Sequence, residues 1–585
     1  MKINLKIFTR IKRLPILIST FGLLTIIYDL GFKRHPDESQ FLQYFYLFSI
    51  LVGAVSITER YFFEKTRPAL KIVAFDVFLV LLSAFLLLKH FGIAENLAPS
   101  FLSNTGWLRL TVVFIFLREF IALKVNFKWA LVNPAQLFIL SFLALIISGC
   151  FFLLLPNATH SGISLIDALF TATSAVCVTG LIVVDTGSYF TFFGQIVIIT
   201  LVQAGGLGIM TFASYFGYFF KGSSSYKKQL VLNELTWSGK LGEVFTTLKR
   251  IIIITVFIEV VGAIFIFWSL NNEVFPVHSE RLFFSIFHSI SGYCNAGFST
   301  LQESLYSIEF RFNYSLHLII AFLFILGGLG FPIVFNLLKY FKNKLINGVL
   351  QLFGKKHSHL PWIININTRI VLMTTLILIS VGTIHFFIFE YNNTLAEHNL
   401  WGKIVGAFFG SVTPRTAGFN TTDTASLSIP VVLMLFFLMW VGASPASTGG
   451  GIKTSTLALA VLNFLSVARG KKRLEVFGRE ISQTSVNRAF SVVFLSVIAI
   501  SLSVFGVLWF DKEKDVLDVA FECVSAFSTV GLSRGITADL SSYSKFILIL
   551  TMFVGRVGML TVLIALFKKV TRYKYRYPAE DVLIH

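Results

Sequence analysis

The stretch from Asp167 to Thr186, DALFTATSAVCVTGLIVVDT, decides the fold of this 585-residue chain. A short apolar helical pattern from Leu165 to about Ala175 leads into Cys177-Val178-Thr179-Gly180-Leu181, and the chain then returns through polar residues. Apolar runs long enough to cross a bilayer lie on both sides of it. The stretch therefore predicts a re-entrant loop, which enters the membrane and leaves it on the same side.

The same pattern recurs three more times along the chain. The later copies read Cys294-Asn295-Ala296-Gly297-Phe298, Arg415-Thr416-Ala417-Gly418-Phe419 and Ser528-Thr529-Val530-Gly531-Leu532. Their glycines are about 113 to 121 residues apart, which indicates an internal repeat. Four such loops in one chain predict four units around a single pore.

The glycine in each loop has a steric reason. Non-helical backbone at membrane depth is tolerated only where it lines a cavity, and carbonyls converge on an ion only if some residues adopt conformations that a Cβ disfavours. A ring of such carbonyls can replace the hydration shell of a potassium ion, as in channel filters with Thr-Val-Gly-type loops. We therefore predict that residues 177–180, 294–297, 415–418 and 528–531 form a potassium filter.

The composition restricts the class of protein. The chain is 55% hydrophobic with 65 phenylalanines and only 14% charged residues, which is typical of a polytopic membrane protein embedded in lipid. A formal net charge of +19 can indicate a nucleic-acid partner, but here the basic residues lie in short runs between apolar spans, so we expect none. Cys150, Cys177, Cys294 and Cys523 lack metal-ligand spacing, which predicts free thiols. No cleavable signal peptide is expected.

Residues 1–130 precede the first loop and predict about four accessory transmembrane helices. The candidate spans are Leu14–Phe32, Phe41–Ile57, Ile72–Leu88 and Leu108–Val125. The fourth carries Arg109, Arg118 and Glu119, and the third carries Asp76. We interpret this part as a packing bundle whose arginines extend to the membrane interfaces, with voltage sensing as the alternative.

Each later unit reads as a span, a re-entrant pore helix and loop, and a second span, an arrangement abbreviated M1-P-M2. We predict repeats over residues 131–250, 251–368, 369–488 and 489–585, giving an all-α fold of about twelve full spans and four half-crossings. Lysines and arginines cluster in the segments that join the repeats and in the C-terminal tail, so these segments are predicted to face the cytoplasm. The four loops would then open to the outside, where an acidic rim attracts cations.

The second span of each repeat carries a further repeated feature. Gly205-Gly206-Leu207-Gly208 and Gly327-Gly328-Leu329-Gly330 lie in the middle of the first two. The third repeat has Gly442-Ala443-Ser444-Pro445-Ala446-Ser447-Thr448-Gly449-Gly450-Gly451-Ile452-Lys453-Thr454 at that place. This segment has too many glycines and serines to remain helical, so it must break the span and line a cavity below the filter. For the glycines, close helix packing and a gating role are both open.

Arg556 stands at the equivalent place in the fourth repeat, within Gly555-Arg556-Val557-Gly558. A permanent charge at membrane depth is costly unless it faces a partner or water. We expect carbonyls of the broken segment to be that partner. A cation on the pore axis would repel potassium until the segment and the arginine moved, so we predict a gate formed by Ala443–Lys453 and Arg556.

These motifs resemble one known family. TATSAVCVTGL, HSISGYCNAGFS, SVTPRTAGFNTTD, GASPASTGGGIKTST and ECVSAFSTVGLSRG with VGRVGMLT are similar to the membrane subunit of the Trk/Ktr/HKT superfamily of potassium transporters. The resemblance covers about residues 130 to 575. It implies four M1-P-M2 units around one ion pathway in the cytoplasmic membrane, gated by an intramembrane loop of the third unit that an arginine of the fourth contacts.

The resemblance also carries implications for partners and ions. It implies a homodimer with a cytoplasmic ring of nucleotide-binding subunits of the TrkA/KtrA type. Family members that favour sodium have serine in place of the first loop glycine, whereas this chain has Gly180, which implies potassium as the transported ion, with sodium open as a coupling or activating ion. Two features depart from the family pattern: Cys294 replaces an asparagine that is common there, and the N-terminal 130 residues exceed the shorter members.

Two other classes of function compete with a gated pore. An alternating-access, sodium-coupled cation carrier would be built from inverted halves with broken helices, whereas the four repeats here have one polarity. A membrane enzyme would need a catalytic motif, and the sequence contains no HExxH, P-loop or nucleophile elbow. We expect no catalytic residues and no covalently bound cofactor.

Overall fold

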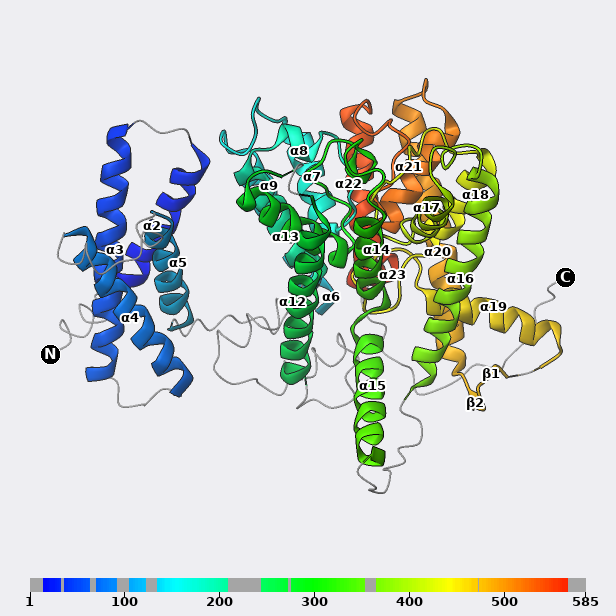
Figure 1. Cartoon of the computed structure of the whole chain (residues 1–585), viewed down its shortest axis with the longest axis horizontal. Coiled ribbons are helices and arrows are strands. Elements are labelled where there is room, and N and C mark those ends of the chain that lie inside the picture. The colour runs from blue at the N-terminus through cyan, green and yellow to red at the C-terminus, as the bar shows by residue number, and fades with distance from the viewer. Residues whose placement is uncertain are drawn as a thin grey trace.

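The computed structural model describes residues 14–32, 36–63, 70–91, 105–122, 134–208, 244–271, 275–352, 364–471 and 473–566 (Figure 1). Helices are the main secondary structure among these residues, loops connect them, and one two-stranded hairpin, β1 (Glu475–Val476) with β2 (Arg479–Glu480), is the one sheet in the described ranges. The all-α, polytopic fold predicted from composition and apolar runs is confirmed. Residues 209–243, which hold the end of the second span of the first predicted repeat and most of the segment after it, and the basic tail from residue 567 lie outside the described residues.

Four helices form an N-terminal bundle, drawn in blue at one side of Figure 1. They are α2 (Leu14–Gly31), α3 (Pro36–Phe63), α4 (Leu70–His90) and α5 (Thr105–Ala122). Ion pairs connect them: Arg118 Nε lies 2.6 Å from Asp76 Oδ1, Arg109 pairs with Asp29, and Arg60 pairs with Glu119.

Arg118 does not extend away from the bundle as we expected, because its partner lies on a neighbouring helix. The bundle contacts the rest of the chain at the end of α2, where the backbone N–H of Asn157 donates to the Gly31 carbonyl at 2.8 Å. The side-chain amide of Asn157 donates to the Leu30 carbonyl at 2.9 Å.

The first span and the pore helix that the sequence predicts for each repeat are separate helices in the structure, and we keep these predicted names for them. The first spans are α6 (Pro134–Leu153), α12 (Val244–Ser269), α16 (Ile366–Glu390) and α20 (Gln483–Phe510). The pore helices are α7 (Leu165–Cys177), α13 (His278–Cys294), α17 (Leu400–Val412) and α21 (Val516–Ser528). Side-chain caps fix where three pore helices start, since Ser164, Asn399 and Asp515 each accept a backbone N–H of the first turn.

The second spans of the second, third and fourth predicted repeats are each broken into two helices. The second spans comprise α9 (Phe192–Gly206), α14 (Tyr314–Leu329) with α15 (Phe331–Leu352), α18 (Ile429–Trp440) with α19 (Thr454–Ala468), and α22 (Ser542–Val557) with α23 (Met559–Leu566). Gly208, Gly330 and Gly558 follow three of these helices with positive φ, and the chain bends by 104° between α14 and α15. Six described helices, or seven if that bent pair is one span, are long and apolar enough to cross a membrane.

The packing of these helices forms a closed ring. The second span of each repeat packs against the pore helix of the next: α9 against α13, α14 against α17, and α18 against α21. The series closes because α22 packs against α7. The pore helices are therefore surrounded by protein, and every residue of α7 from Phe170 to Cys177 is buried. This ring holds the four glycine loops at its centre.

Candidate functional site: four loops and the broken helix behind them

The four loop glycines lie against one another in a closed series. A Cβ added to Gly297 would lie 2.9 Å from the carbonyl oxygen of Ala417 in the third loop. A Cβ added to Gly180 would collide with the Ala296 carbonyl of the second loop. The same addition at Gly418 would meet the Val530 carbonyl, and at Gly531 it would meet the Thr179 carbonyl. All four glycines also have positive φ, between 69° and 92°. Any side chain would therefore push a neighbouring loop outward and strain its own backbone.

The residue two positions before each glycine is also left-handed, although none of these residues is glycine. Val178, Asn295, Thr416 and Thr529 have φ between 51° and 80°. In three loops this residue caps the pore helix, and the next N–H bonds back to the helix, as Thr179 does to the Ser174 carbonyl at 2.8 Å. A β-branched residue such as Val178 is rare in this conformation, so the surrounding contacts must hold it there.

In three of the four loops, the first of the four predicted filter residues belongs to the pore helix, and the other three follow the helix. Cys177, Cys294 and Ser528 are the last residues of their pore helices. The third loop departs from this because α17 ends earlier, at Val412, and Pro414 cannot continue a helix. Arg415 in that loop is buried, and its Nε has no hydrogen-bond partner among the described residues.

A hydroxyl at the end of each pore helix supports its loop, a feature that the sequence analysis missed. The Ser174 and Ser291 hydroxyls donate to the carbonyls of Leu181 and Phe298 at 2.7 Å. In the fourth loop, the Gly531 N–H donates to Ser525 Oγ at 3.1 Å. These serines stand six residues before their glycines, which is a signal that an alignment of the four copies contains.

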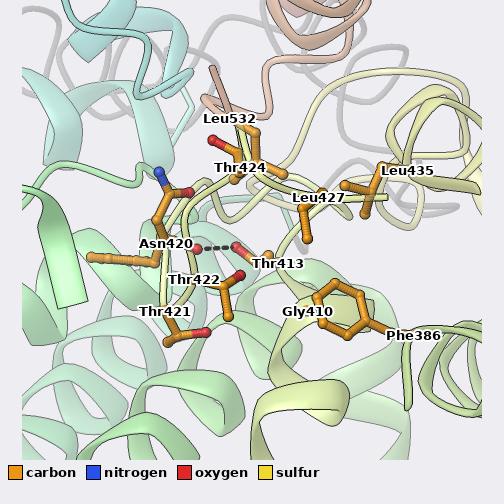
Figure 2. A pocket seen from close by; sticks show the side chains of 11 residues that line it. Phe386, Gly410, Thr413, Asn420, Thr421, Thr422, Thr424, Leu427, Leu435 and Leu532 are labelled. Carbon is orange, nitrogen blue, oxygen red and sulfur yellow. Dashed lines mark hydrogen bonds between the residues drawn. The ribbon is translucent and has the colours of Figure 1, made fainter. Parts of the chain in front are cut away.

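The third loop has the same support from a different position. Thr413 donates its hydroxyl to the Phe419 carbonyl at 2.7 Å, which is the bond drawn in Figure 2. Thr413 stands five residues before Gly418 because Pro414 ends the helix early. A small cavity adjoins this loop, bordered by Phe386, Gly410 and three further threonines of the segment that follows the glycine (Figure 2).

The predicted gate segment lies against the inner ends of the loops. Residues 441–453 separate α18 from α19, with Ala446 and Gly451 at positive φ. The Thr448 hydroxyl donates to Asn295 Oδ1 at 3.1 Å, and Asn295 Nδ2 donates to the Thr416 hydroxyl at 3.1 Å. A Cβ added to Gly450 would collide with the Thr529 hydroxyl. A Cβ added to Gly449 would likewise collide with the Thr416 hydroxyl, so the segment contacts the second, third and fourth loops at once.

Arg556 connects this segment to the first repeat. Its guanidinium donates to the Thr448 carbonyl and, at 2.7 Å, to the Gly205 carbonyl of α9. Lys453 donates instead within the segment, to the Gly449 carbonyl at 2.6 Å and the Gly450 carbonyl at 3.3 Å. One partner of Arg556, the Thr448 carbonyl, belongs to the broken segment as expected, and the other, the Gly205 carbonyl, does not.

Comparison with known proteins identifies the family. The model of the TrkH family, described as a cation transport protein, matches residues 110–575. The chain belongs to the TrkH cation transport protein family. Its TrkH-family relatives are transporters and not enzymes, and the protein is a multi-pass protein of the cytoplasmic membrane. The match begins within α5, so α2, α3 and α4 precede the TrkH region.

Two relatives and one solved structure agree with this assignment. The chain is 36% identical to Ktr system potassium uptake protein B of Bacillus subtilis (78% of this chain, 97% of the relative). It is also 36% identical to the potassium/sodium uptake protein NtpJ of Enterococcus hirae (77% and 97%). The crystal structure of the potassium transporter TrkH from Vibrio parahaemolyticus has the same fold, with a TM-score of 0.58 at 19% identity over 84% of this chain and 96% of that one.

Proposed function

We propose that this protein takes up potassium ions across the cytoplasmic membrane through the ring of four loops. The observation that carries the proposal is the closed series of glycine contacts, in which each of the four glycines lies against the backbone of the next loop. Carbonyls brought this close around one axis are the ligands that a dehydrated potassium ion requires. The printed names of the two relatives, which are potassium and potassium/sodium uptake proteins, support the same ion class.

Buried hydroxyls add further oxygen ligands to the proposed filter. The hydroxyl oxygens of Thr179, Ser528 and Thr529 are buried and have no hydrogen-bond partner among the described residues. Buried polar atoms of this kind usually have a partner. We assign them to contact with the permeating ion or its water. The filter comprises residues 177–180, 294–297, 415–418 and 528–531, and the division of the chain into repeats at 131, 251, 369 and 489 is part of the same proposal.

The segment Ala443–Lys453 and Arg556 form the gate in this proposal. The segment contacts three of the four loops, and Arg556 connects it to α9 of the first repeat. Ions can pass only when the segment moves away from the loops, and that movement breaks the bond between Arg556 and Thr448. We also propose a homodimer controlled by a cytoplasmic nucleotide-binding subunit, with sodium as the coupling or activating ion.

The test is potassium uptake in cells that lack their own potassium uptake systems, at limiting external potassium. Wild type should restore growth, and Gly180→Ser should admit sodium because its side chain displaces the second loop. The matched control is Gly162→Ser, since Gly162 also has positive φ but nothing lies within 4 Å of its added Cβ. A wild-type protein that fails to restore growth with its regulatory subunit present would overturn the proposal. Equal ion preference in both glycine variants would favour the alternating-access carrier.

A further inference from the structure

The second and fourth loops carry a hydrogen-bonded pair that the first and third loops do not have in the described structure. In both, the pore-helix residue nine positions before the glycine bonds to a serine two positions after it. These pairs are His288 with Ser299 and Glu522 with Ser533. We call them the outer brackets, because each connects the pore helix to the chain that leaves the loop.

The bracket of the second loop has a defined polarity. Nδ1 of His288 lies 3.0 Å from the Phe284 carbonyl, which can only accept, so Nδ1 carries the proton. In the neutral ring, which full burial favours over the charged one, Nε2 accepts the hydroxyl of Ser299 at 2.9 Å. The Ser299 oxygen in turn accepts the N–H of Leu301 at 3.0 Å. The His288 ring is fully buried, so its position is fixed by these bonds and by the ring of Phe284 stacked on it.

The bracket of the fourth loop repeats this arrangement with a carboxylate. Glu522 is 1% exposed and accepts the Ser533 hydroxyl, the Arg534 N–H at 3.1 Å and the Thr537 hydroxyl at 2.9 Å. The Ser533 oxygen accepts the N–H of Gly535 at 2.9 Å, as Ser299 accepts that of Leu301. The equivalent serine of each loop therefore donates its hydroxyl to the pore-helix side chain and accepts the backbone N–H two residues further on.

The equivalent positions of the other two loops are occupied differently. In the first repeat, the Thr171 hydroxyl bonds to the Asp167 carbonyl of its own helix, and Ile182 stands at the serine position. In the third, Phe409 packs against His317 and Phe324, and Asn420 stands at the serine position. The cavity of Figure 2 adjoins this third loop. Neither loop is connected to its own pore helix at this level in the part of the chain that the structure describes.

The unbracketed loops contact the bracketed ones instead. Gly187, after the first loop, lies so close to Thr300 that an added Cβ would collide with the Thr300 carbonyl. Thr424, after the third loop, donates its hydroxyl to the Ser533 carbonyl and accepts from Arg534 at 3.4 Å. Because the glycine contacts run from the first loop to the fourth in order, the two brackets face each other across the ring.

We propose that His288 and Glu522 are positioning residues that fix the outer mouth of all four loops through Ser299 and Ser533, and so determine ion selectivity. The inference rests on the proposed function. Left-handed backbone in the loops is strained and persists only where neighbouring contacts hold it. Two brackets on opposite sides are sufficient, because each holds its own loop directly and one neighbouring loop by contact.

The experiment uses the purified full-length protein with Ser299→Ala, Ser533→Ala and both together. Each change removes one oxygen from a bracket and leaves the pore helices intact. The matched control is Thr171→Val, which removes a hydroxyl at the equivalent depth of the first repeat. Potassium and sodium are added separately, and the rise in melting temperature gives the binding preference. Flux of the two ions in proteoliposomes gives the transport preference.

We expect each serine variant to lose about tenfold in potassium-over-sodium preference, the equivalent of one buried hydrogen bond, and the double variant to lose more. Glu522→Gln should lower the preference at least as much as Ser533→Ala, because the glutamine side chain keeps one acceptor oxygen for the three donors that Glu522 binds. The inference is overturned, and the proposed function is not, if the serine variants keep the wild-type potassium-over-sodium preference. Their melting temperature without added ions should then equal that of Thr171→Val. A wild type that shows neither potassium uptake nor potassium preference overturns the proposed function instead.

Discussion

Replacing Arg556 with alanine should increase potassium flux through the protein. In the structure, the guanidinium holds the segment Ala443–Lys453 by its bond to the Thr448 carbonyl and is itself held by the Gly205 carbonyl at 2.7 Å. A hydrogen bond from a charged donor contributes about 1.5–3 kcal/mol. If opening breaks the Thr448 bond, its loss should shift the ratio of closed to open protein by about ten- to a hundredfold.

The assay is the initial rate of potassium efflux from proteoliposomes, expressed per milligram of reconstituted protein. Lys453→Ala is the matched control, because it removes a part-buried charge from the same segment while its bonds go to Gly449 and Gly450 of that segment. Arg556→Lys retains the charge with fewer donors and should give an intermediate rate. The reasoning is refuted if Arg556→Ala, at wild-type yield and melting temperature, transports no faster than wild type. Equal acceleration by Lys453→Ala would assign the effect to charge alone.

Three further predictions concern the ring and the bundle. Gly297→Ala should abolish selective uptake while the protein still reaches the membrane, because its Cβ would lie 2.9 Å from the Ala417 carbonyl; ion competition in the uptake assay measures this. Thr413→Val should weaken potassium preference more than Thr413→Ser, since only valine loses the bond to the third loop, about 1 kcal/mol; unchanged competition by sodium would count against it. Asp76→Asn should lower the free energy of unfolding by about 3–5 kcal/mol, because Arg118 keeps its charge without its partner. Thermal unfolding measures this change, and the potassium flux per folded molecule should stay unchanged.

The loop glycines could be predicted from the sequence because the steric requirement belongs to each residue and recurs four times. The support of the third loop could not, because Pro414 ends α17 early and moves the hydroxyl from the sixth to the fifth position before the glycine. A search at a fixed offset would find Ser174, Ser291 and Ser525 and miss Thr413.

The breaks in the second spans of the second and fourth repeats and the ion pairs of the N-terminal bundle were not predicted either. Apolar composition continues through Gly330 and Gly558, so hydropathy does not show that the helix stops there. Arg118 was expected at an interface because its partner, Asp76, is distant in sequence and its orientation depends on how the helices pack. The steric requirement at a loop glycine can be inferred from that residue and its sequence neighbours. The partner of a side chain on another helix depends on tertiary packing, which the sequence alone does not show.

The ring of pore helices is formed by one chain, and this has a consequence for its chemistry. In an assembly of four identical subunits, every side chain near the axis would appear four times, so an arginine at the position of Arg556 would bring four positive charges to one place. Covalent continuity allows this chain to have Arg556 in one repeat alone, one glycine-rich segment and two outer brackets in a ring of four similar loops. Each of these features can change by itself, so selection can adjust conduction, closure and ion preference in one quadrant without altering the other three.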